Sequence, residues 1–197
     1  MKYSVPNNER EVEILPNHLD LASIAEIENS EFEGFYKSEK VFTENLTDET
    51  LFNLEYIKNI HETALGHLYN FAGKYRNVNL EKEGFKFPSA KYLEINMIEF
   101  EKEILLKLPH VYKTKSILIK NIAMVHAELL FIHPFREGNG RVARILANMM
   151  SYKAGYNKIK FEELEDNILL QKKYIEGVQF AGIKDYKKME SIIKKIF

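Results

Sequence analysis

The chain has 197 residues, of which 45% are hydrophobic, 29% charged and 12% aromatic, so it can bury the core of one domain and is not disordered. It contains no cysteine, which excludes a disulfide framework and a thiolate metal site. The net charge of −1 hides an asymmetry, because residues 1–60 carry 5 Lys/Arg against 13 Asp/Glu and the remainder 23 against 16. The basic residues are too dispersed to predict direct nucleic-acid binding.

No targeting segment is expected. Residues 1–17 lack the apolar region of a secretory signal peptide. The longest apolar segment, 117–132, is interrupted by four polar residues and predicts a buried helix rather than a membrane span. Together with the missing cysteines, these features favour a cytoplasmic protein without membrane association.

Apolar residues recur mostly at spacings of three and four, so the fold class expected is all-α or mainly α, a helical bundle. From residue 14 we expect a turn at Pro16 and Asn17 and then an acidic helix up to about residue 35. Residues 47–50 are expected to cap a second helix that continues to residue 71. The segment 116–132 is apolar almost all round and is placed at the centre of the bundle. Further helices are expected at 142–154, with a glycine C-cap at Gly155, and around 161–180 and 184–196.

Residues 77–88 depart from the helical pattern. Val78, Leu80, Phe85 and Phe87 alternate with polar residues on either side of 81–84, which predicts a β-hairpin with a four-residue loop. Two interpretations stay open. The segment is either a loop that packs two phenylalanines, or an exposed edge on which an extended peptide can be laid as a third strand.

The segment HPFREGNGRVAR, residues 133–144, follows the central helix. Pro134 ends that helix near residue 132 or 133, and helix-compatible sequence resumes around Gly140. A glycine-flanked turn leading into a helix N-terminus exposes consecutive N–H groups and suits a phosphate. Gly138 and Gly140 let phosphate oxygens approach the backbone, and Asn139 can donate a hydrogen bond.

The side chains of this segment add to that chemistry. Arg141 and Arg144 lie on one face of the first helical turn, and their forked guanidinium groups match phosphate oxygens. Glu137 is a candidate magnesium ligand, expected near solvent. His133, with a reference pKa of about 6.5, is a candidate general base. Each residue alone has a structural explanation as a cap, turn or ion pair, but together they predict phosphorus-transfer chemistry.

This segment resembles the signature of the Fic family, H-P-F-x-[D/E]-G-N-G-R-x-x-R. All nine specified positions are filled, by His133, Pro134, Phe135, Glu137, Gly138, Asn139, Gly140, Arg141 and Arg144. Residues 60–79 are similar to the family's segment before its flap, and the predicted hairpin falls where the flap belongs. A looser likeness begins at residue 14, so the resemblance covers roughly 14–190.

The resemblance implies a helical bundle with a small β-hairpin flap that transfers AMP from ATP to a Ser, Thr or Tyr hydroxyl of a target protein. His133 would deprotonate the hydroxyl, and Glu137 would hold Mg²⁺ on the phosphates. Backbone N–H groups of Gly138–Gly140 would bind the phosphate, with Asn139 on the α-phosphate. Arg141 and Arg144 would orient the β- and γ-phosphates. The target protein would dock along the 77–88 hairpin.

We expect an acidic helical extension in 1–54, a catalytic core in 55–190 and the end of a C-terminal helix in 191–197. Alternatives to AMP transfer are transfer of another phosphate-containing group, such as UMP or phosphocholine, and a catalytically silent nucleotide-binding module. Related Doc proteins replace the second glycine of the GNG triplet by lysine, so Gly140 favours AMP transfer.

Many Fic proteins are inhibited by a glutamate within [S/T]-x-x-x-E-[G/N]. None of the six glutamates followed by Gly or Asn has Ser or Thr four residues earlier, and Glu28–Asn29 and Glu33–Gly34 come nearest. One hypothesis is inhibition in trans by a small antitoxin-like partner whose glutamate would occupy Arg144, which would make the chain the toxin of a toxin–antitoxin pair. The alternatives are a diverged intramolecular inhibitor or no inhibitor.

Overall fold

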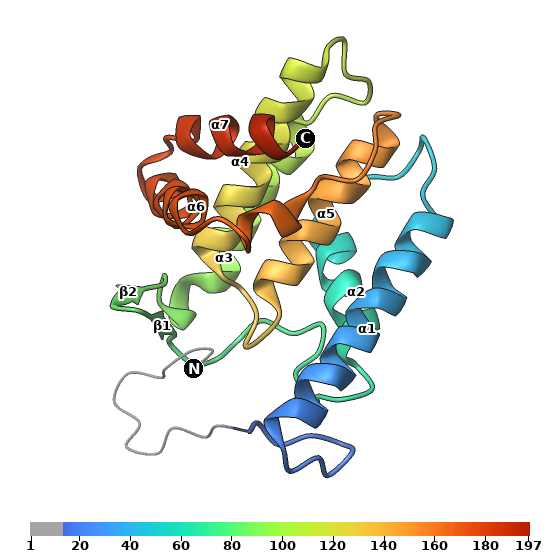
Figure 1. Ribbon diagram of the computed structural model, residues 1–197, viewed down its shortest axis with the longest axis vertical. Coiled ribbons are helices and arrows are strands. Elements are labelled where there is room, and N and C mark those ends of the chain that lie inside the picture. Colours follow the sequence, from blue (N-terminus) through green and yellow to red (C-terminus); the bar gives the residue numbers. More distant parts are fainter. Residues whose placement is uncertain (1–13) are drawn as a thin grey trace.

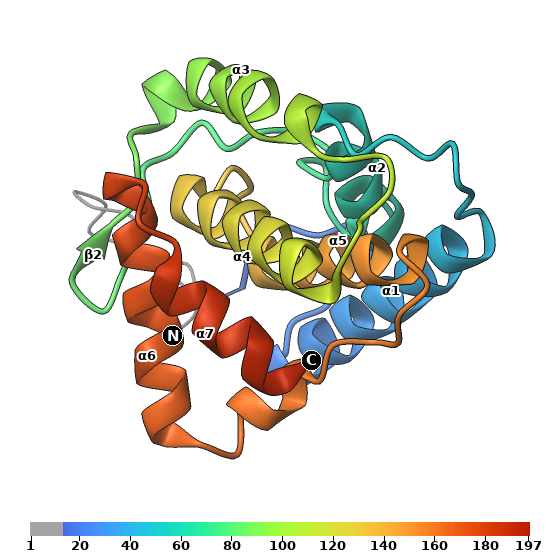
Figure 2. The same cartoon turned by 90° about the horizontal axis from the view of Figure 1, so that it is seen from above.

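The computed structural model describes residues 14–197, which form seven α-helices and one two-stranded antiparallel sheet. Helix α4 (Lys115–Ile132) runs through the middle of the bundle, and Figure 2 shows the other helices arranged around it. Eleven of its 18 residues are buried. The mainly α fold class and the central position of this helix are therefore confirmed.

The remaining helices surround α4, either in direct contact or through a neighbouring helix (Figure 1). Their bounds are Ile24–Glu44 for α1, Leu54–Leu65 for α2, Leu93–Glu103 for α3, Asn139–Lys153 for α5, Ile168–Phe180 for α6 and Lys187–Ile196 for α7. Helices α1, α2 and α5 contact one another on one side, and α6 and α7 pair on the other. Short 3₁₀ helices cover Ala90–Tyr92, Leu105–Lys107, Phe161–Leu164 and Ala181–Ile183.

Helix α1 begins where its N-terminal hydrogen bonds are satisfied locally. The Ser23 side chain accepts from the N–H of Glu26, and the Glu26 carboxylate accepts from the N–H of Ser23, which is a capping box. The acidic helix expected in this region is therefore confirmed, but it continues to Glu44 rather than ending near residue 35.

The predicted start of the second helix is wrong. Residues 47–50 form a closed turn, in which the Thr50 N–H donates to the Thr47 carbonyl and the Thr47 N–H donates to the Thr50 hydroxyl. The N-cap of α2 is Asn53, whose side chain accepts from the N–H of Tyr56 at 2.8 Å. The helix ends at Leu65, short of the expected residue 71.

The C-terminal half differs from the prediction in one place. Residues 161–180 are not one helix, because a 3₁₀ turn at Phe161–Leu164 precedes α6, which starts after its cap Asn167. The end of α5 is as expected, since Gly155 follows the helix with a φ of +79°. Helix α3 is not predicted by the sequence analysis.

The hairpin is present at the edge of the molecule (Figure 1), but its loop is shorter than predicted. Strands β1 (Glu81–Lys82) and β2 (Phe85–Lys86) are antiparallel, and Lys82 faces Phe85. The turn is therefore only Glu83 and Gly84, with φ of 51° and 80°, as in a type I′ turn. Beyond the strands, the Phe87 N–H donates to the Leu80 carbonyl at 3.1 Å.

No helix between residues 14 and 197 combines the length and the apolar character that a membrane span needs. The expected lack of a signal peptide concerns residues 1–17, of which 1–13 lie outside the described residues. The division into 1–54, 55–190 and 191–197 remains a prediction.

Candidate active site

The loop between α4 and α5 needs two left-handed backbone positions. His133, directly after α4, has a φ of 55°, and its N–H still donates to the Leu129 carbonyl at 3.0 Å. Gly138, directly before α5, has a φ of 77°. A Cβ at Gly138 would lie 2.7 Å from the Phe35 ring, so glycine is required there both by conformation and by space.

Side chains of the loop itself fill its interior and hydrogen-bond to its backbone. Asn139 is 1% exposed, and its side-chain amide accepts from the Phe135 N–H and donates to the Phe135 carbonyl, both at 2.8 Å. Phe135 is fully buried and stacks on His61, with ring centroids 4.0 Å apart. Asn139 therefore shapes the loop with its side chain, and Phe135 anchors the loop in the core.

His61 of α2 is a loop-holding residue that the sequence analysis did not identify. Its Nδ1 accepts from the Gly73 N–H at 2.9 Å, so Nε2 carries the proton and donates to the Glu137 carbonyl at 3.1 Å. Burial lowers the pKa of His61 to about 4, which keeps the ring neutral. The only signal for it in the sequence is its place in the segment 60–79.

The predicted base, His133, is 5% exposed and lies under the hairpin, where the Phe87 ring stacks on its imidazole at 3.9 Å. Its Nδ1 lies 2.9 Å from the Leu130 carbonyl, which can only accept, so Nδ1 carries the proton and Nε2 the lone pair. Burial lowers the pKa of His133 to about 3. The ring is therefore neutral, as a general base must be, throughout the physiological pH range.

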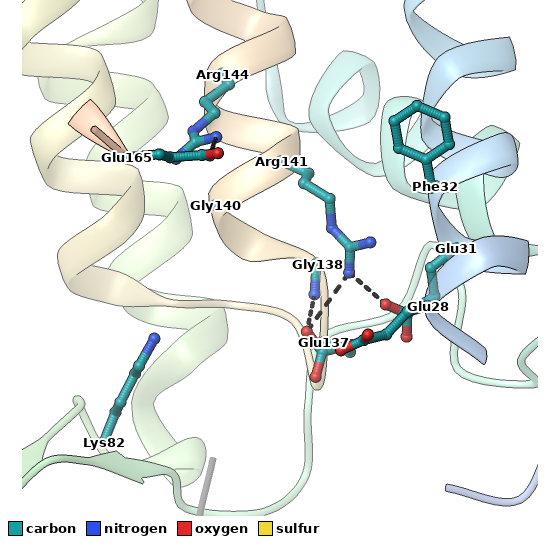
Figure 3. Close-up of a pocket in the computed structure, with 10 residues that line it drawn as sticks. All are labelled: Glu28, Glu31, Phe32, Lys82, Glu137, Gly138, Gly140, Arg141, Arg144 and Glu165. Atoms are coloured by element: carbon teal, nitrogen blue, oxygen red, sulfur yellow. Dashed lines mark hydrogen bonds and ion pairs between the residues drawn. The ribbon is translucent and has the colours of Figure 1, made fainter. Parts of the chain in front are cut away.

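A pocket of about 440 Å³ opens beside the loop (Figure 3). Its walls come from α1, the hairpin, the loop with α5, and the segment after the 3₁₀ turn, through Glu28, Glu31, Phe32, Lys82, Glu137, Gly138, Gly140, Arg141, Arg144 and Glu165. Five of the seven predicted site residues are brought together here. The other two, His133 and Asn139, are buried in the loop and do not line the pocket.

Both motif arginines are paired with carboxylates that the sequence did not point to (Figure 3). Arg141 donates to Glu31 of α1 at 2.6 Å and lies 3.7 Å from Glu137. Arg144 donates to the exposed Glu165 at 2.9 Å. The pocket therefore holds four carboxylates as well as three cationic side chains, and a bound polyanion would compete with these ion pairs.

Glu137 is not near solvent as expected. It is 8% exposed, and its carboxylate accepts from the N–H of Gly138 at 2.9 Å. The Gly138 N–H, which is predicted from the sequence to donate to a phosphate, is therefore already hydrogen-bonded to Glu137. The helical ladder of α5 starts with the Val142 N–H donating to the Gly138 carbonyl. The N–H groups of residues 139–141 therefore have no acceptor within the helix, an arrangement that suits an anion.

A hydrogen-bonded pair on two other helices, His126 and Tyr174, contacts Arg144. His126 of α4 is buried with its pKa lowered by burial to about 3, and its Nδ1 donates to the Ala143 carbonyl at 3.1 Å. Nε2 therefore accepts from the Tyr174 hydroxyl of α6 at 2.8 Å. The Tyr174 oxygen in turn accepts a hydrogen bond from the Arg144 side chain. Burial raises the pKa of Tyr174 to about 12, and the nearby positive charge of Arg144 partly offsets this increase.

These features define a class of protein, a helical bundle with a glycine-containing loop before a helix N-terminus and a neutral histidine in the same loop. The sequence model of the Fic/DOC family matches residues 51–151. The chain therefore belongs to the Fic/DOC family.

Curated relatives carry the same domain within longer chains. The chain is 31% identical over 144 residues to "Protein adenylyltransferase Fic" of Nematostella vectensis, covering 71% of this chain and 33% of the relative. It is 32% identical over 110 residues to "Protein adenylyltransferase VbhT" of Bartonella schoenbuchensis, covering 54% and 22%. The chain thus spans a third or less of the length of these relatives.

Solved structures show the same fold. The BepC effector protein of Bartonella tribocorum, solved with bound AMPPNP, superposes with a TM-score of 0.76 at 18% identity, covering 93% of this chain and 92% of that one. A Fic domain from Bartonella quintana with bound ADP gives a TM-score of 0.77 at 19% identity, covering 93% and 90%.

Proposed function

We propose that the chain is a protein adenylyltransferase that moves AMP from ATP to a Ser, Thr or Tyr hydroxyl of a target protein. The observation that carries the proposal is the position of a neutral imidazole in the same loop that forms the anion site at the N-terminus of α5. Relatives at 31% and 32% identity named protein adenylyltransferases support the reaction class.

In this reaction His133 is the general base. Its Nδ1 is committed to the Leu130 carbonyl, so Nε2 accepts the proton of the target hydroxyl. The hydroxyl oxygen forms a bond to the α-phosphorus, the bond from that phosphorus to the bridging oxygen breaks, and pyrophosphate leaves. The backbone of His133 is left-handed, and its carbonyl accepts a hydrogen bond from Arg76. This backbone geometry sets the direction in which the imidazole ring points.

The phosphates bind where cationic groups converge. The N–H groups at residues 139–141 receive the α-phosphate region, with Asn139 contributing its backbone rather than its occupied side chain. Arg141 and Arg144 orient the β- and γ-phosphates after exchanging Glu31 and Glu165 for phosphate oxygens. This exchange makes nucleotide affinity depend on how firmly the two glutamates hold the arginines.

Magnesium fits the site through Glu137. Mg²⁺ is usually held by one or two carboxylates together with phosphate oxygens and water. Glu137 offers one carboxylate on the pocket wall, and residues 14–197 contain no cluster of three or more His, Asp or Glu that would hold a metal alone. When bound, the ion supplies charge neutralisation on the phosphates. Glu137, whose carboxylate accepts from the Gly138 N–H and lies 3.7 Å from Arg141, would be the residue that holds the ion.

The hairpin at 77–88 is the proposed docking edge for the target protein. Within residues 14–197, strands β1 and β2 are two residues long and form a sheet of these two strands alone, with an outer edge on each strand. An extended target segment can add to such an edge through main-chain hydrogen bonds. Phe87, which follows β2, stacks on the imidazole of His133, and this contact supports a docking edge beside the base.

Control of the reaction by a small antitoxin-like partner also belongs to this proposal. Arg144 is 34% exposed on its side chain and its partner Glu165 is 62% exposed, so a glutamate from another chain could replace Glu165. The intramolecular alternative is supported by Glu31, which already pairs with Arg141. Adding a candidate partner and measuring AMP transfer separates the two. The cytoplasm, where ATP and Mg²⁺ are abundant, is the proposed compartment.

The test uses ATP labelled at the α- or the γ-phosphate, incubated with a cell lysate and either the wild-type chain or His133→Ala. We expect protein labelling from the α-labelled pool alone and none with the variant. Retention of γ-label on protein would indicate transfer of phosphate. Labelling of protein from labelled UTP or CDP-choline would indicate transfer of another group. ATP binding without any labelling would indicate a silent nucleotide-binding module.

A further inference from the structure

Arg76 lies in the segment between α2 and the hairpin and does not line the pocket. It is 4% exposed. Its guanidinium donates three hydrogen bonds to main-chain carbonyls, from Nε to His133 at 2.8 Å, from one terminal nitrogen to Val78 at 2.6 Å and from the other to Pro88 at 2.6 Å. The backbone N–H of Arg76 donates to the Pro134 carbonyl at 2.8 Å.

These acceptors come from the two structures that the proposed reaction must align. Val78 and Pro88 stand on either side of the hairpin, so one guanidinium joins the two ends of the hairpin base. His133 and Pro134 begin the loop. Arg76 therefore ties the hairpin base and the loop to the same side chain.

Arginine is suited to this position and lysine is not. A planar guanidinium presents donors on three separate nitrogens and so reaches three carbonyls that lie apart, whereas the three donors of a lysine ammonium all sit on one nitrogen. Burial, with a smaller effect from Arg136, lowers the pKa of Arg76 to about 10, so the group remains cationic at neutral pH. Hydrogen bonds to the three carbonyls compensate for its desolvation.

The bond to His133 has a particular consequence. A non-glycine residue with a positive φ is strained and persists where its surroundings determine it. The His133 backbone has a φ of 55°, and its carbonyl is fixed by Nε of Arg76. The orientation of the imidazole follows from that backbone, and Phe87 of the hairpin lies flat on the ring.

We propose that Arg76 is a positioning residue that holds the left-handed backbone of His133 and the base of the 77–88 hairpin in one geometry, so that the base and the docking edge are set together. Its effect on catalysis rests on the proposed function. The coupling between hairpin and imidazole does not, and it can be measured without any turnover.

The experiment compares Arg76→Lys and Arg76→Met with Lys74→Met, which removes an exposed cation two residues away whose ammonium contacts only the Asn70 carbonyl. Ile122→Val in the centre of α4 serves as a control for general destabilisation. Four measurements are made on the full chain: the unfolding midpoint, the Kd for ATP, the steady-state kinetics of α-label transfer (kcat and KM), and the NMR titration of the His133 ring, assigned by its loss in His133→Ala.

For both Arg76 variants we expect the Kd for ATP to stay within about 3-fold, because the phosphate contacts are untouched, while kcat falls by about 10²-fold. The His133 ring should titrate at a higher pH than in the wild type, and the hairpin amide resonances should shift with it. Lys74→Met should match the wild type in all four measurements. Ile122→Val should lower the unfolding midpoint without moving the His133 titration.

The proposal is overturned if folded Arg76→Lys keeps the wild-type kcat and His133 titration, or if Ile122→Val moves that titration equally. If Arg76→Met does not fold, Arg76→Lys decides by the same criteria. If the wild type transfers no label but the His133 and hairpin resonances change together in Arg76→Lys, the positioning role stands and the proposed function has failed. If those resonances do not change, the positioning role has failed whatever the activity.

Discussion

Arg141, the first arginine of the loop helix, donates to the buried carboxylate of Glu31 at 2.6 Å, across 110 positions of sequence. Glu31 is 1% exposed and also accepts from the Tyr69 hydroxyl at 2.8 Å. The ion pair therefore connects α1 to the proposed phosphate site and occupies an arginine that the phosphates of a nucleotide would need there.

Substituting Glu31→Gln should raise the affinity for ATP by about 3- to 10-fold. The amide keeps an oxygen for Tyr69 but loses the charge that competes with phosphate for Arg141. Calorimetric titration with ATP checks this, with Glu33→Gln on the exposed face of α1 as the matched control. An unchanged affinity would mean that Glu31 and phosphate do not compete.

Substituting Glu165→Ala should change the unfolding free energy by less than about 0.5 kcal/mol, because Glu165 is 62% exposed and such surface ion pairs contribute little. It should nevertheless strengthen ATP binding about 2- to 3-fold by freeing Arg144. Glu163→Ala, which removes a nearby carboxylate that pairs with Lys160 instead, is the control. Equal effects of the two substitutions would show a general charge effect rather than release of Arg144.

The protonation of three buried histidines should make the fold sensitive to acid. Burial lowers the pKa of His61 to about 4 and those of His126 and His133 to about 3, against about 6.5 in the unfolded chain. Above pH 6.5 both states bind no proton and stability does not change. As the pH falls from 6.5 toward 4, only the unfolded state takes up these protons, so stability decreases, by up to about 1.4 kcal/mol per pH unit for each histidine.

The measurement is urea unfolding between pH 7.5 and 5, compared with His133→Ala. The variant should show a shallower pH dependence by about one proton near pH 5.5, where carboxylates contribute little. Identical slopes would contradict the neutral, buried state of His133.

Glu137→Gln should fold like the wild type but lose at least about 10²-fold in magnesium-dependent transfer. The Gln oxygen can still accept from the Gly138 N–H, whereas the charge that would hold the ion is gone. Glu137→Ala should additionally cost about 1–2 kcal/mol, because it leaves that buried donor without its acceptor. Magnesium titration of transfer together with thermal unfolding separates the two effects, and full activity of Glu137→Gln would remove Glu137 as a metal ligand.

Gly138→Ala should destabilise the fold more than Gly84→Ala. Both glycines have a positive φ, of 77° and 80°, and alanine at such a position costs about 1 kcal/mol. Only at Gly138 would the new Cβ meet a neighbour, the Phe35 ring at 2.7 Å, whereas nothing lies within 4 Å at Gly84. Overpacking should add about 1–3 kcal/mol at Gly138. Equal unfolding midpoints for the two variants would contradict the close approach of α1 to the loop.

Local patterns predicted the elements better than their ends. The start of α2 illustrates this. Residues 47–50 contain good capping residues, but Asn53 is the cap, because the start of a helix depends on which residues its apolar face buries. Helix α3 was missed although Leu93, Met97 and Phe100 recur at helical spacing and are buried. Apolar side chains also lie on its exposed face, as at Ile95 and Ile98, and they obscure the period.

The sequence by itself determined which residues form the loop and where the loop begins. Pro134 must end α4, Gly138 permits the turn, and His133, Glu137 and two arginines lie within twelve residues. These consequences are local, because they depend on backbone geometry within a few residues.

Only the tertiary structure decided which side chains those groups meet. It paired Arg141 with Glu31, buried Glu137, and joined Arg76 to both the hairpin and the loop. Such contacts join residues that are far apart in the chain and depend on how whole helices pack. The spacing of residues along one helix does not specify them, because the same amphipathic pattern is compatible with many neighbours.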